Sequence, residues 1–256
     1  MKGLLAYIIW NKVNMLEWLT DGIVENFDPE KTDLLFILDN PIDGTDIKLK
    51  EILDTKLSKF KHIGHSYFED TYKFPCQNMA LKVCKDRNYD YVICPQDDQK
   101  ITDKNLVENI ENTIKLYGEN LGVIGLRDGF DFGYGNMYSS EWSESVLSQE
   151  KRLSNGEVHS CLLLNDGGLV YTRKLIETIG FHDVDSYKRF FIEDDYCAKA
   201  HYDFGLTNIL LGNDLIHRKE NVSINTDHYD RSMNYEVGDM EAFKNKWLAK
   251  IESCKR

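Results

Sequence analysis

The chain lacks the features of several special classes of protein. Its longest apolar runs fall well short of the roughly 20 residues that span a bilayer. Met1-Lys2-Gly3-Leu4 has neither the charged region nor the cleavage site of a signal peptide. Six cysteines are widely spaced and form no Cys-x-x-Cys pair, which favours free thiols over disulfides or a zinc site. We therefore expect a cytoplasmic protein without a transmembrane segment, and leave peripheral attachment to a membrane open.

Basic residues are too few to suggest a nucleic-acid partner. The net charge is −12, and no basic stripe is available to neutralise a phosphate backbone. A phosphate-containing ligand would therefore need a metal ion for charge balance. The 256 residues, 42% of them apolar and 29% charged, are enough for one globular domain with a substantial core. No internal repeat or low-complexity tract divides them.

Short β-rich runs alternate with helical patterns through the first half, which is typical of βαβ units and predicts an α/β fold with a mostly parallel sheet flanked by helices. The expected strands are 4–10, 34–38, 62–67, 91–94 and 121–126. Helices are expected from Met15 to about Asp28, over 47–60, from Pro75, and from a Thr102 cap to Gly118.

The pattern then fades from 127 to about 160. Tyr134, Tyr138 and Trp142 in this segment can stack on a sugar, or they can anchor a surface loop. Order returns with strands over 161–164 and 168–171, a helix from Thr172 to Gly180, a helical pattern after Glu193-Asp194-Asp195, a strand over 206–211 and a final amphipathic helix. We expect a single domain, 1–256, made of a nucleotide-binding half (1–126), an acceptor and catalytic half (127–218) and a C-terminal tail and helix (219–256).

Polar residues follow three of the predicted strands. Asn11, Asp39 and Asp97-Asp98 each come where an apolar run ends. Ligands of open α/β sheets bind outside the carboxyl ends of the strands. Adjacent carboxylates there suit a hard divalent cation shared with a phosphate group. These residues are therefore the first candidates for a binding site.

The order of these features resembles GT-A glycosyltransferases of the family 2 kind. The resemblance covers roughly residues 4 to 218 and rests on Asn11, Asp39, Asp97-Asp98, Gly168-Leu169-Val170-Tyr171-Thr172-Arg173, Gly180-Phe181-His182-Asp183, Glu193-Asp194 and His217. It implies a GT-A fold and transfer of a sugar from a nucleoside diphosphate donor, usually of uridine, with Mn²⁺ or Mg²⁺. The acceptor would be a hydroxyl group on a glycan, a lipid-linked molecule or a protein.

The resemblance also implies donor-side roles. Asp39 would accept a hydrogen bond from the ring N–H of the nucleotide base, and Asn78 and Gly168 would face the donor. The alternatives are a turn-forming acid at Asp39 and a helix-surface amide at Asn78. Asp97 would contact the ribose or sugar and Asp98 would bind the metal. Gln96 occupies the place of the first acid of the strict D-x-D pattern, which leaves the ligand set open.

On the acceptor side, Asp194 resembles the general base of the Glu-Asp motif, which deprotonates the acceptor hydroxyl so that it attacks with inversion. Acids at a helix start also cap it without catalysis, and Asp195 suits that structural role. His217 corresponds to a histidine that ligates the metal, although a lone histidine is more often packed or hydrogen-bonded. Farther on, His228, Tyr229 and Arg231 fall in a polar stretch that either covers the donor or is a solvated surface.

Three other functions stay open. A nucleotidyltransferase would use a similar sheet and metal, but Asn11-Lys12-Val13-Asn14 is not a glycine-rich, basic phosphate loop. A metal-dependent phosphohydrolase has no need for an aromatic acceptor loop. A non-catalytic sugar-nucleotide-binding protein would not need both Asp98 and Asp194.

Overall fold

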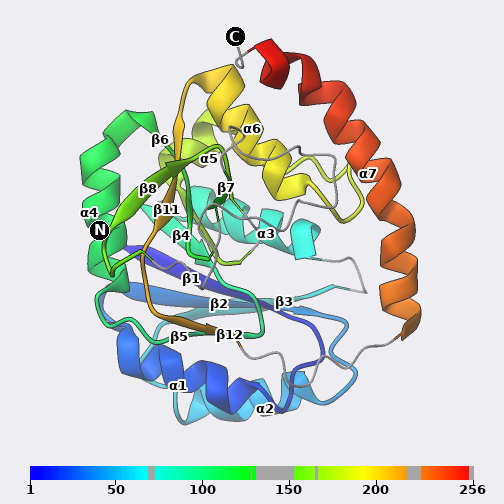
Figure 1. The fold of residues 1–256 in the computed structure, drawn as a ribbon. Coiled ribbons are helices and arrows are strands. Elements are labelled where there is room, and N and C mark those ends of the chain that lie inside the picture. The colour runs from blue at the N-terminus through cyan, green and yellow to red at the C-terminus, as the bar shows by residue number, and fades with distance from the viewer. Residues whose placement is uncertain (69–72, 128, 131–152, 165–166, 218–225, 254–256) are drawn as a thin grey trace.

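The fold of the chain was obtained as a computed structural model (Figure 1), which describes residues 1–68, 73–127, 129–130, 153–164, 167–217 and 226–253. Helices pack on both faces of a central sheet, as the sequence predicts. The aromatic candidates Tyr134, Tyr138 and Trp142 lie outside the described residues. The side chains of His217, His228, Tyr229 and Arg231 also lie outside them.

The central sheet has eight strands in the order β3-β2-β1-β4-β10-β6-β11-β8. Their bounds are β1 Gly3–Ile9, β2 Thr32–Asp39, β3 His62–Phe68, β4 Tyr91–Cys94, β6 Leu121–Gly125, β8 Val158–Cys161, β10 Leu169–Thr172 and β11 Thr207–Leu211. Strands β1, β2, β3 and β4 are mutually parallel. Strand β10 lies antiparallel between β4 and β6, and β8 is antiparallel at the end of the sheet. The sheet is thus mostly parallel, with a strand from the second half of the chain inserted at its centre.

The two faces of the sheet carry different helices because successive strand residues point to opposite sides. Leu4 and Ala6 of β1 pack with α3, α5 and α6, while Leu5 and Tyr7 pack with α1, α2 and α4. The bounds are α1 Leu16–Asn26, α2 Thr45–Asp54, α3 Lys73–Asp86, α4 Leu106–Tyr117, a 3₁₀ turn η1 Gly118–Asn120, α5 Arg173–Ile179, α6 Ile192–Phe204 and α7 Thr226–Ser253. Helix α7 runs along the outside of the molecule beside α6 (Figure 1).

Two small antiparallel pairs complete the described strands: β5 (Gln99–Ile101) with β12 (Leu215–His217), and β7 (Gly129–Phe130) with β9 (Leu163–Leu164). The sequence did not predict β5, because three residues are too short to show a period of two. In the described part of the chain, no helix is long and apolar enough to cross a bilayer.

Local signals at the helix ends were mostly correct. The Thr172 hydroxyl accepts a hydrogen bond from the Leu175 N–H at 3.1 Å and caps α5, and Gly118 and Gly180 end α4 and α5. The Thr102 cap was wrong: α4 begins after Asn105, and the Thr102 N–H and hydroxyl both donate to the Asp214 carbonyl oxygen. Near the start of α4, the Asp103 carboxylate accepts the Asn105 N–H at 2.8 Å instead.

Other predictions concerned helix length and thiols. Helix α2 ends at Asp54, not near residue 60, and turns follow it. All five cysteines in the described residues, at positions 76, 84, 94, 161 and 197, are buried free thiols, as expected.

Candidate active site

The carboxyl ends of the parallel strands meet at one side of the sheet, called here the carboxyl edge. Ile9 pairs with Leu38, so the chain after β1 and Asp39 at the end of β2 lie side by side. Strand β4 is parallel to β1 and ends at Cys94, three residues before Asp97. The prediction that Asn11, Asp39 and the acidic pair gather at one edge is therefore confirmed by the backbone topology.

The segment Gln96-Asp97-Asp98-Gln99, called here the acidic turn, is closed by its two glutamines. The Gln99 backbone N–H donates to the Gln96 carbonyl oxygen at 3.1 Å. The Gln99 side chain accepts from the Gln96 N–H at 3.1 Å and donates to the Gln96 side-chain oxygen at 3.3 Å. Gln99 is fully buried, whereas Asp97 and Asp98 are partly exposed. The amides thus fix the turn and leave the two acids half-buried at its surface, which gives Gln96 a structural reason to differ from an acid.

Asp97 is tied to the first strand. Its carboxylate accepts a hydrogen bond from the Trp10 N–H at 3.0 Å. Burial raises the pKa of Asp97 to about 6, and the neighbouring Asp98 carboxylate also raises it. The charges of Lys12 and Lys73 and the Trp10 N–H act in the opposite direction. A positive ligand at this turn would therefore be favoured by the two carboxylates together.

The small sheet brings the C-terminal half to the acidic turn. His217 of β12 pairs with Gln99 of β5, so its backbone lies directly across from the residue that follows Asp98. Opposed residues of an antiparallel pair have Cα atoms about 4.5–5.5 Å apart. The backbones of Asp98 and His217, distant in sequence, therefore lie close together, as a shared metal site requires.

Gly168 begins the inserted strand at the same edge. Its φ of +90° is in the region that favours glycine, and its carbonyl oxygen accepts from the Leu126 N–H at 2.9 Å. A Cβ at this position would lie 3.3 Å from the Gln99 side-chain oxygen. A glycine is therefore needed where the chain passes against the acidic turn.

Asp39 and its neighbours form the part of the edge beside the first strand. The Asp39 side chain is 3% exposed. Asn11 and Asn40 have φ of +48° and +51°, and the Asn11 side-chain oxygen accepts from the Ile42 N–H at 3.0 Å. Asparagine tolerates this left-handed conformation better than most residues. The loops after β1 and β2 are therefore linked to each other next to Asp39.

Asn78 has a structural task. Its side-chain amide donates to the His182 carbonyl oxygen at 3.0 Å, and its oxygen accepts from the His182 N–H at 2.9 Å. These bonds join α3 to the loop after α5. They use one donor and one acceptor site of the amide. A donor contact by Asn78 stays a prediction and would have to use its remaining capacity.

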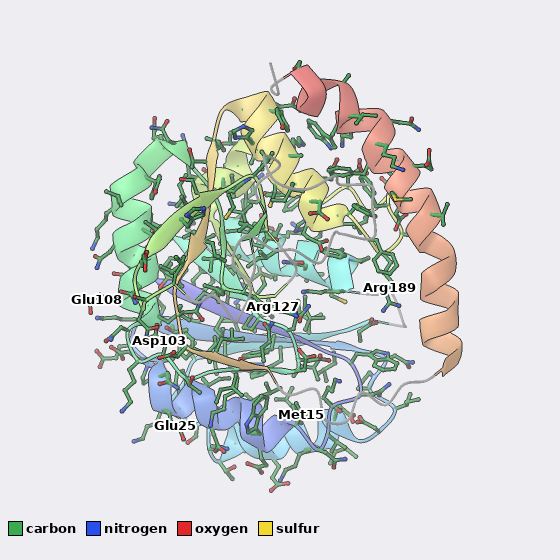
Figure 2. All side chains as sticks on the ribbon, viewed as in Figure 1. Met15, Glu25, Asp103, Glu108, Arg127 and Arg189 are labelled. Atoms are coloured by element: carbon green, nitrogen blue, oxygen red, sulfur yellow. The ribbon has the colours of Figure 1, made fainter. Side chains whose placement is uncertain are left out.

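The sequence analysis missed the basic residues near the acidic turn. Lys12 is 9% exposed, and both Lys12 and Lys73 lie near enough to lower the pKa of Asp97. Arg127, labelled in Figure 2, follows β6. Its side chain packs so closely on Gly167 that a Cβ there would overlap it. A signal was available, because Lys12 follows a parallel strand and Lys73 begins a helix. Part of the charge of a diphosphate can therefore be balanced by side chains.

The start of α6 holds the three acids in different surroundings. Asp194 is 8% exposed in the first helical turn. Asp195 is 3% exposed; its oxygens accept from the Tyr187 hydroxyl at 2.9 Å, the Trp247 indole N–H at 2.6 Å and the Lys246 ammonium at 3.0 Å. The prediction that Asp195 is the structural acid is confirmed. The role of Asp194 as general base stays a prediction.

The donor set suits a hard divalent cation. Carboxylate oxygens such as those of Asp97 and Asp98 are the ligands that Mn²⁺ and Mg²⁺ prefer. Within the part of the chain that the structure describes, no three His, Cys, Asp or Glu side chains form a metal cluster. A cation at this turn would therefore depend on additional oxygen ligands, such as the phosphates of a donor.

The strand order, the acidic turn after β4 and the inserted β10 define the class of fold: this is the GT-A fold of nucleotide-diphospho-sugar transferases. The sequence itself matches no family model and no curated protein at a significant level.

Solved structures of this fold superpose on most of the chain. A mannosyltransferase from Pyrobaculum calidifontis, PcManGT in complex with GDP-Man and Mn²⁺, has a TM-score of 0.59 and 12% identity over 98% of this chain and 71% of its own. GalNAc-T7 with UDP, GalNAc and Mn²⁺ has a TM-score of 0.65 and 10% identity over 91% of this chain and 48% of its own. TarS 1–349 from S. aureus with UDP-GlcNAc has a TM-score of 0.54 and 14% identity over 93% of this chain and 66% of its own. The chain therefore spans 48–71% of the length of these three chains.

Proposed function

We propose that the protein is a metal-dependent glycosyltransferase that moves a sugar from a nucleoside diphosphate to a hydroxyl acceptor. The observation that carries the proposal is the pairing of β5 with β12, which brings the backbone of His217 next to Asp98 at the carboxyl edge. The GT-A fold supports it, because the similar structures include complexes with UDP- and GDP-sugars and with Mn²⁺.

The donor site would extend along the carboxyl edge from β2 to β4. The buried Asp39 would accept the ring N–H of a uracil base, which makes a UDP-sugar the expected donor. Asp97, held by the Trp10 N–H, would contact the ribose or sugar. Lys12 and Lys73 would offset part of the diphosphate charge. The net negative charge of the chain had suggested that only a metal ion could do so.

Asp98 and His217 would hold the cation, together with phosphate oxygens. When bound, the cation supplies Lewis-acid stabilisation of the charge that develops on the leaving diphosphate. The Gln96 and Gln99 amides keep the acidic turn in the conformation that presents Asp98. Binding of the cation and of the donor should therefore depend on each other.

Asp194 would act as the general base. It lies in the first turn of α6 and is 8% exposed, directly before Asp195. In the proposed step, its carboxylate takes the proton of the acceptor hydroxyl while the oxygen attacks the anomeric carbon. The bond to the diphosphate breaks on the opposite face, and the configuration inverts. General base catalysis of this kind contributes about 10²–10⁴-fold to the rate.

The rival functions are weaker on the same observations. A nucleotidyltransferase usually carries a glycine-rich, basic phosphate loop near the first strand, and Asn11-Lys12-Val13-Asn14 is not one. A phosphohydrolase would accept simple phosphate esters without the sugar. A non-catalytic binding protein would bind nucleotide sugars and leave them intact.

A melting-temperature screen tests the proposal. Five nucleotide sugars are added with and without Mn²⁺: UDP-glucose, UDP-galactose, UDP-GlcNAc, UDP-GalNAc and GDP-mannose. We expect at least one of them to raise the melting temperature only when the metal is present, because ligands that bind the folded state stabilise it. Asp98→Ala should lose this shift. Asp194→Asn should keep it but lose hydrolysis of the bound donor by about 10²–10⁴-fold.

Asp86→Asn is a matched control, because Asp86 is an exposed acid at the end of α3 whose carboxylate pairs with Lys82. It should leave both binding and hydrolysis unchanged. A metal-dependent shift that survives in Asp98→Ala would rule out the metal assignment. Full hydrolysis by Asp194→Asn would rule out the base.

A further inference from the structure

The C-terminal helix binds the segment that leads into α6 through one buried carboxylate. Asp239 of α7 is 3% exposed. One of its oxygens accepts from the Lys188 N–H at 2.9 Å, and the other accepts from the N–H groups of Arg189 at 2.7 Å and Phe190 at 2.8 Å. Successive backbone N–H groups that converge on one anion form a nest, and hydrogen bonds to a charged acceptor are about twice as strong as neutral ones. Figure 2 shows Arg189 on the side of the molecule that α7 covers.

The residue after this nest has a strained backbone. Phe191 has φ of +61° and ψ of 9°, a left-handed conformation that is an outlier for a bulky residue. Its carbonyl oxygen accepts the Asp195 N–H at 2.8 Å, so the strained residue begins α6. Strain of this kind persists only where the surroundings enforce it. Here they include Phe243 of α7, whose ring centroid lies 5.5 Å from that of Phe191.

The same helix also fixes the residue that follows the proposed base. Trp247 and Lys246 of α7 donate to the Asp195 carboxylate at 2.6 Å and 3.0 Å. Helix α7 therefore holds the chain on both sides of Asp194: before it through the turn at 188–191, and after it through Asp195.

We propose that Asp239 is a positioning residue that sets the place of the Asp194 carboxylate through the turn at 188–191. The proposal rests on the proposed function, since it takes Asp194 as the general base. Asp239 lies far along the chain from Asp39 and the acidic turn and bonds neither. Its loss should therefore affect the chemical step and leave donor binding intact.

The test compares Asp239→Asn with the unmodified protein. The amide places an N–H₂ group against backbone donors, so the turn should loosen and amide exchange at Lys188, Arg189 and Phe190 should become faster. With the nucleotide sugar that gives the largest Mn²⁺-dependent melting shift, kcat for hydrolysis should fall by about 10- to 100-fold, because small misplacements of a catalytic group are costly. The donor KM and the Mn²⁺-dependent shift should stay the same.

Two further variants sharpen the result. Glu241→Gln makes the same charge change two residues along α7. Glu241 is exposed and forms an ion pair with Lys244. This variant should behave as the unmodified protein. Asp239→Glu keeps the carboxylate and should restore part of kcat. If Asp239→Asn does not fold, Trp247→Phe removes one N–H from Asp195 and should lower kcat without a change in donor KM.

An unchanged kcat in the folded variant, or a parallel loss of donor binding and kcat, would overturn the positioning role. Unchanged amide exchange at 188–190 would overturn the nest as its cause. If no nucleotide sugar shifts the melting of the unmodified protein, the proposed function itself fails and the positioning role fails with it. A defect confined to hydrolysis by the Asp239 variants leaves the proposed function intact.

Discussion

Replacing Gln99 by leucine tests whether the acidic turn depends on its closing amide. The change keeps a buried side chain of similar size but removes two hydrogen bonds to Gln96, at 3.1 Å and 3.3 Å. The backbone bond from Gln99 to Gln96 and the bond from the Tyr7 hydroxyl to the Gln99 carbonyl oxygen are kept. The variant should therefore fold, with a turn that is less well fixed.

The cost can be estimated from the groups left behind. Each lost bond contributes about 0.5–1.5 kcal/mol net, and a buried donor that loses its partner costs about 1–3 kcal/mol. Gln96 is half-buried, so water can reach it in part. We expect a loss of about 2–4 kcal/mol in the free energy of unfolding. For a chain of this size that corresponds to a fall of roughly 4–16 °C in melting temperature.

The assay is thermal and denaturant unfolding, with and without Mn²⁺ and UDP. We expect Gln99→Leu to lower stability and also to reduce the ligand-dependent shift, because a loose turn holds Asp98 less well. Gln77→Leu is the matched control: Gln77 is equally buried and donates to the Tyr171 hydroxyl at 3.0 Å, and it should lose about 1 kcal/mol without altering the shift. An undiminished shift in Gln99→Leu would refute the link between the amide and the site.

Three further predictions concern single residues. Asp39→Asn should weaken UDP binding about tenfold to a hundredfold and leave binding of inorganic pyrophosphate with Mn²⁺ unchanged, as measured by calorimetry; equal losses for both ligands would contradict a base contact. Gly168→Ala should lower the free energy of unfolding by about 1–3 kcal/mol, which is more than the loss for Gly44→Ala. Both glycines have φ near +90°, but only a Cβ at position 168 would contact the Gln99 side chain. Equal losses for the two variants in denaturant unfolding would contradict this contact. Burial of the Asp33 carboxylate opposes its ionisation, but hydrogen bonds from Lys2 and Tyr89 outweigh the effect of burial and lower the pKa of Asp33. The ionised Asp33 therefore stabilises the fold above about pH 4, and this stabilisation is lost as the pH falls through the lowered pKa. Asp33→Asn should therefore lower the free energy of unfolding by about 1–3 kcal/mol at pH 7 and by much less at pH 3. An equal loss at both pH values would exclude this link between the ionisation of Asp33 and stability.

Much of the local structure follows from local chemistry. The strands that end at Asp39 and Cys94 were predictable because apolar runs stop at polar residues, and the α5 cap was predictable because a threonine precedes the helix and a glycine ends it. The Thr102 cap failed because the hydrogen bonds of its N–H and hydroxyl to Asp214, a partner from the other half of the chain, hold Thr102 next to β12, and α4 begins only after Asn105. Local sequence patterns therefore predict helix ends correctly unless a distant segment of the chain forms hydrogen bonds with the same residues.

The candidate site divides in the same way. The two carboxylates at Asp97-Asp98 could be found from the sequence, because a buried strand that ends in acids is a local pattern. The positions of Lys12, after a parallel strand, and of Lys73, at a helix start, were visible in the sequence, but their effect on the pKa of Asp97 was not, because it depends on how close the folded chain brings these residues to Asp97. The separate roles of Asp194 and Asp195 were proposed from their order, but only the position of Trp247 on α7 explains them.

The sequence by itself determined most of the longer strands, the ends of α4 and α5 at glycine and the acids at the strand ends, since each depends on neighbours a few residues away. Only the tertiary structure decided that β10 enters the middle of the sheet, that His217 lies across from Gln99, and that α7 holds the chain around Asp194. Those choices depend on hydrogen bonds and packing between segments far apart in the chain. A local pattern carries no information about which distant partner will provide them.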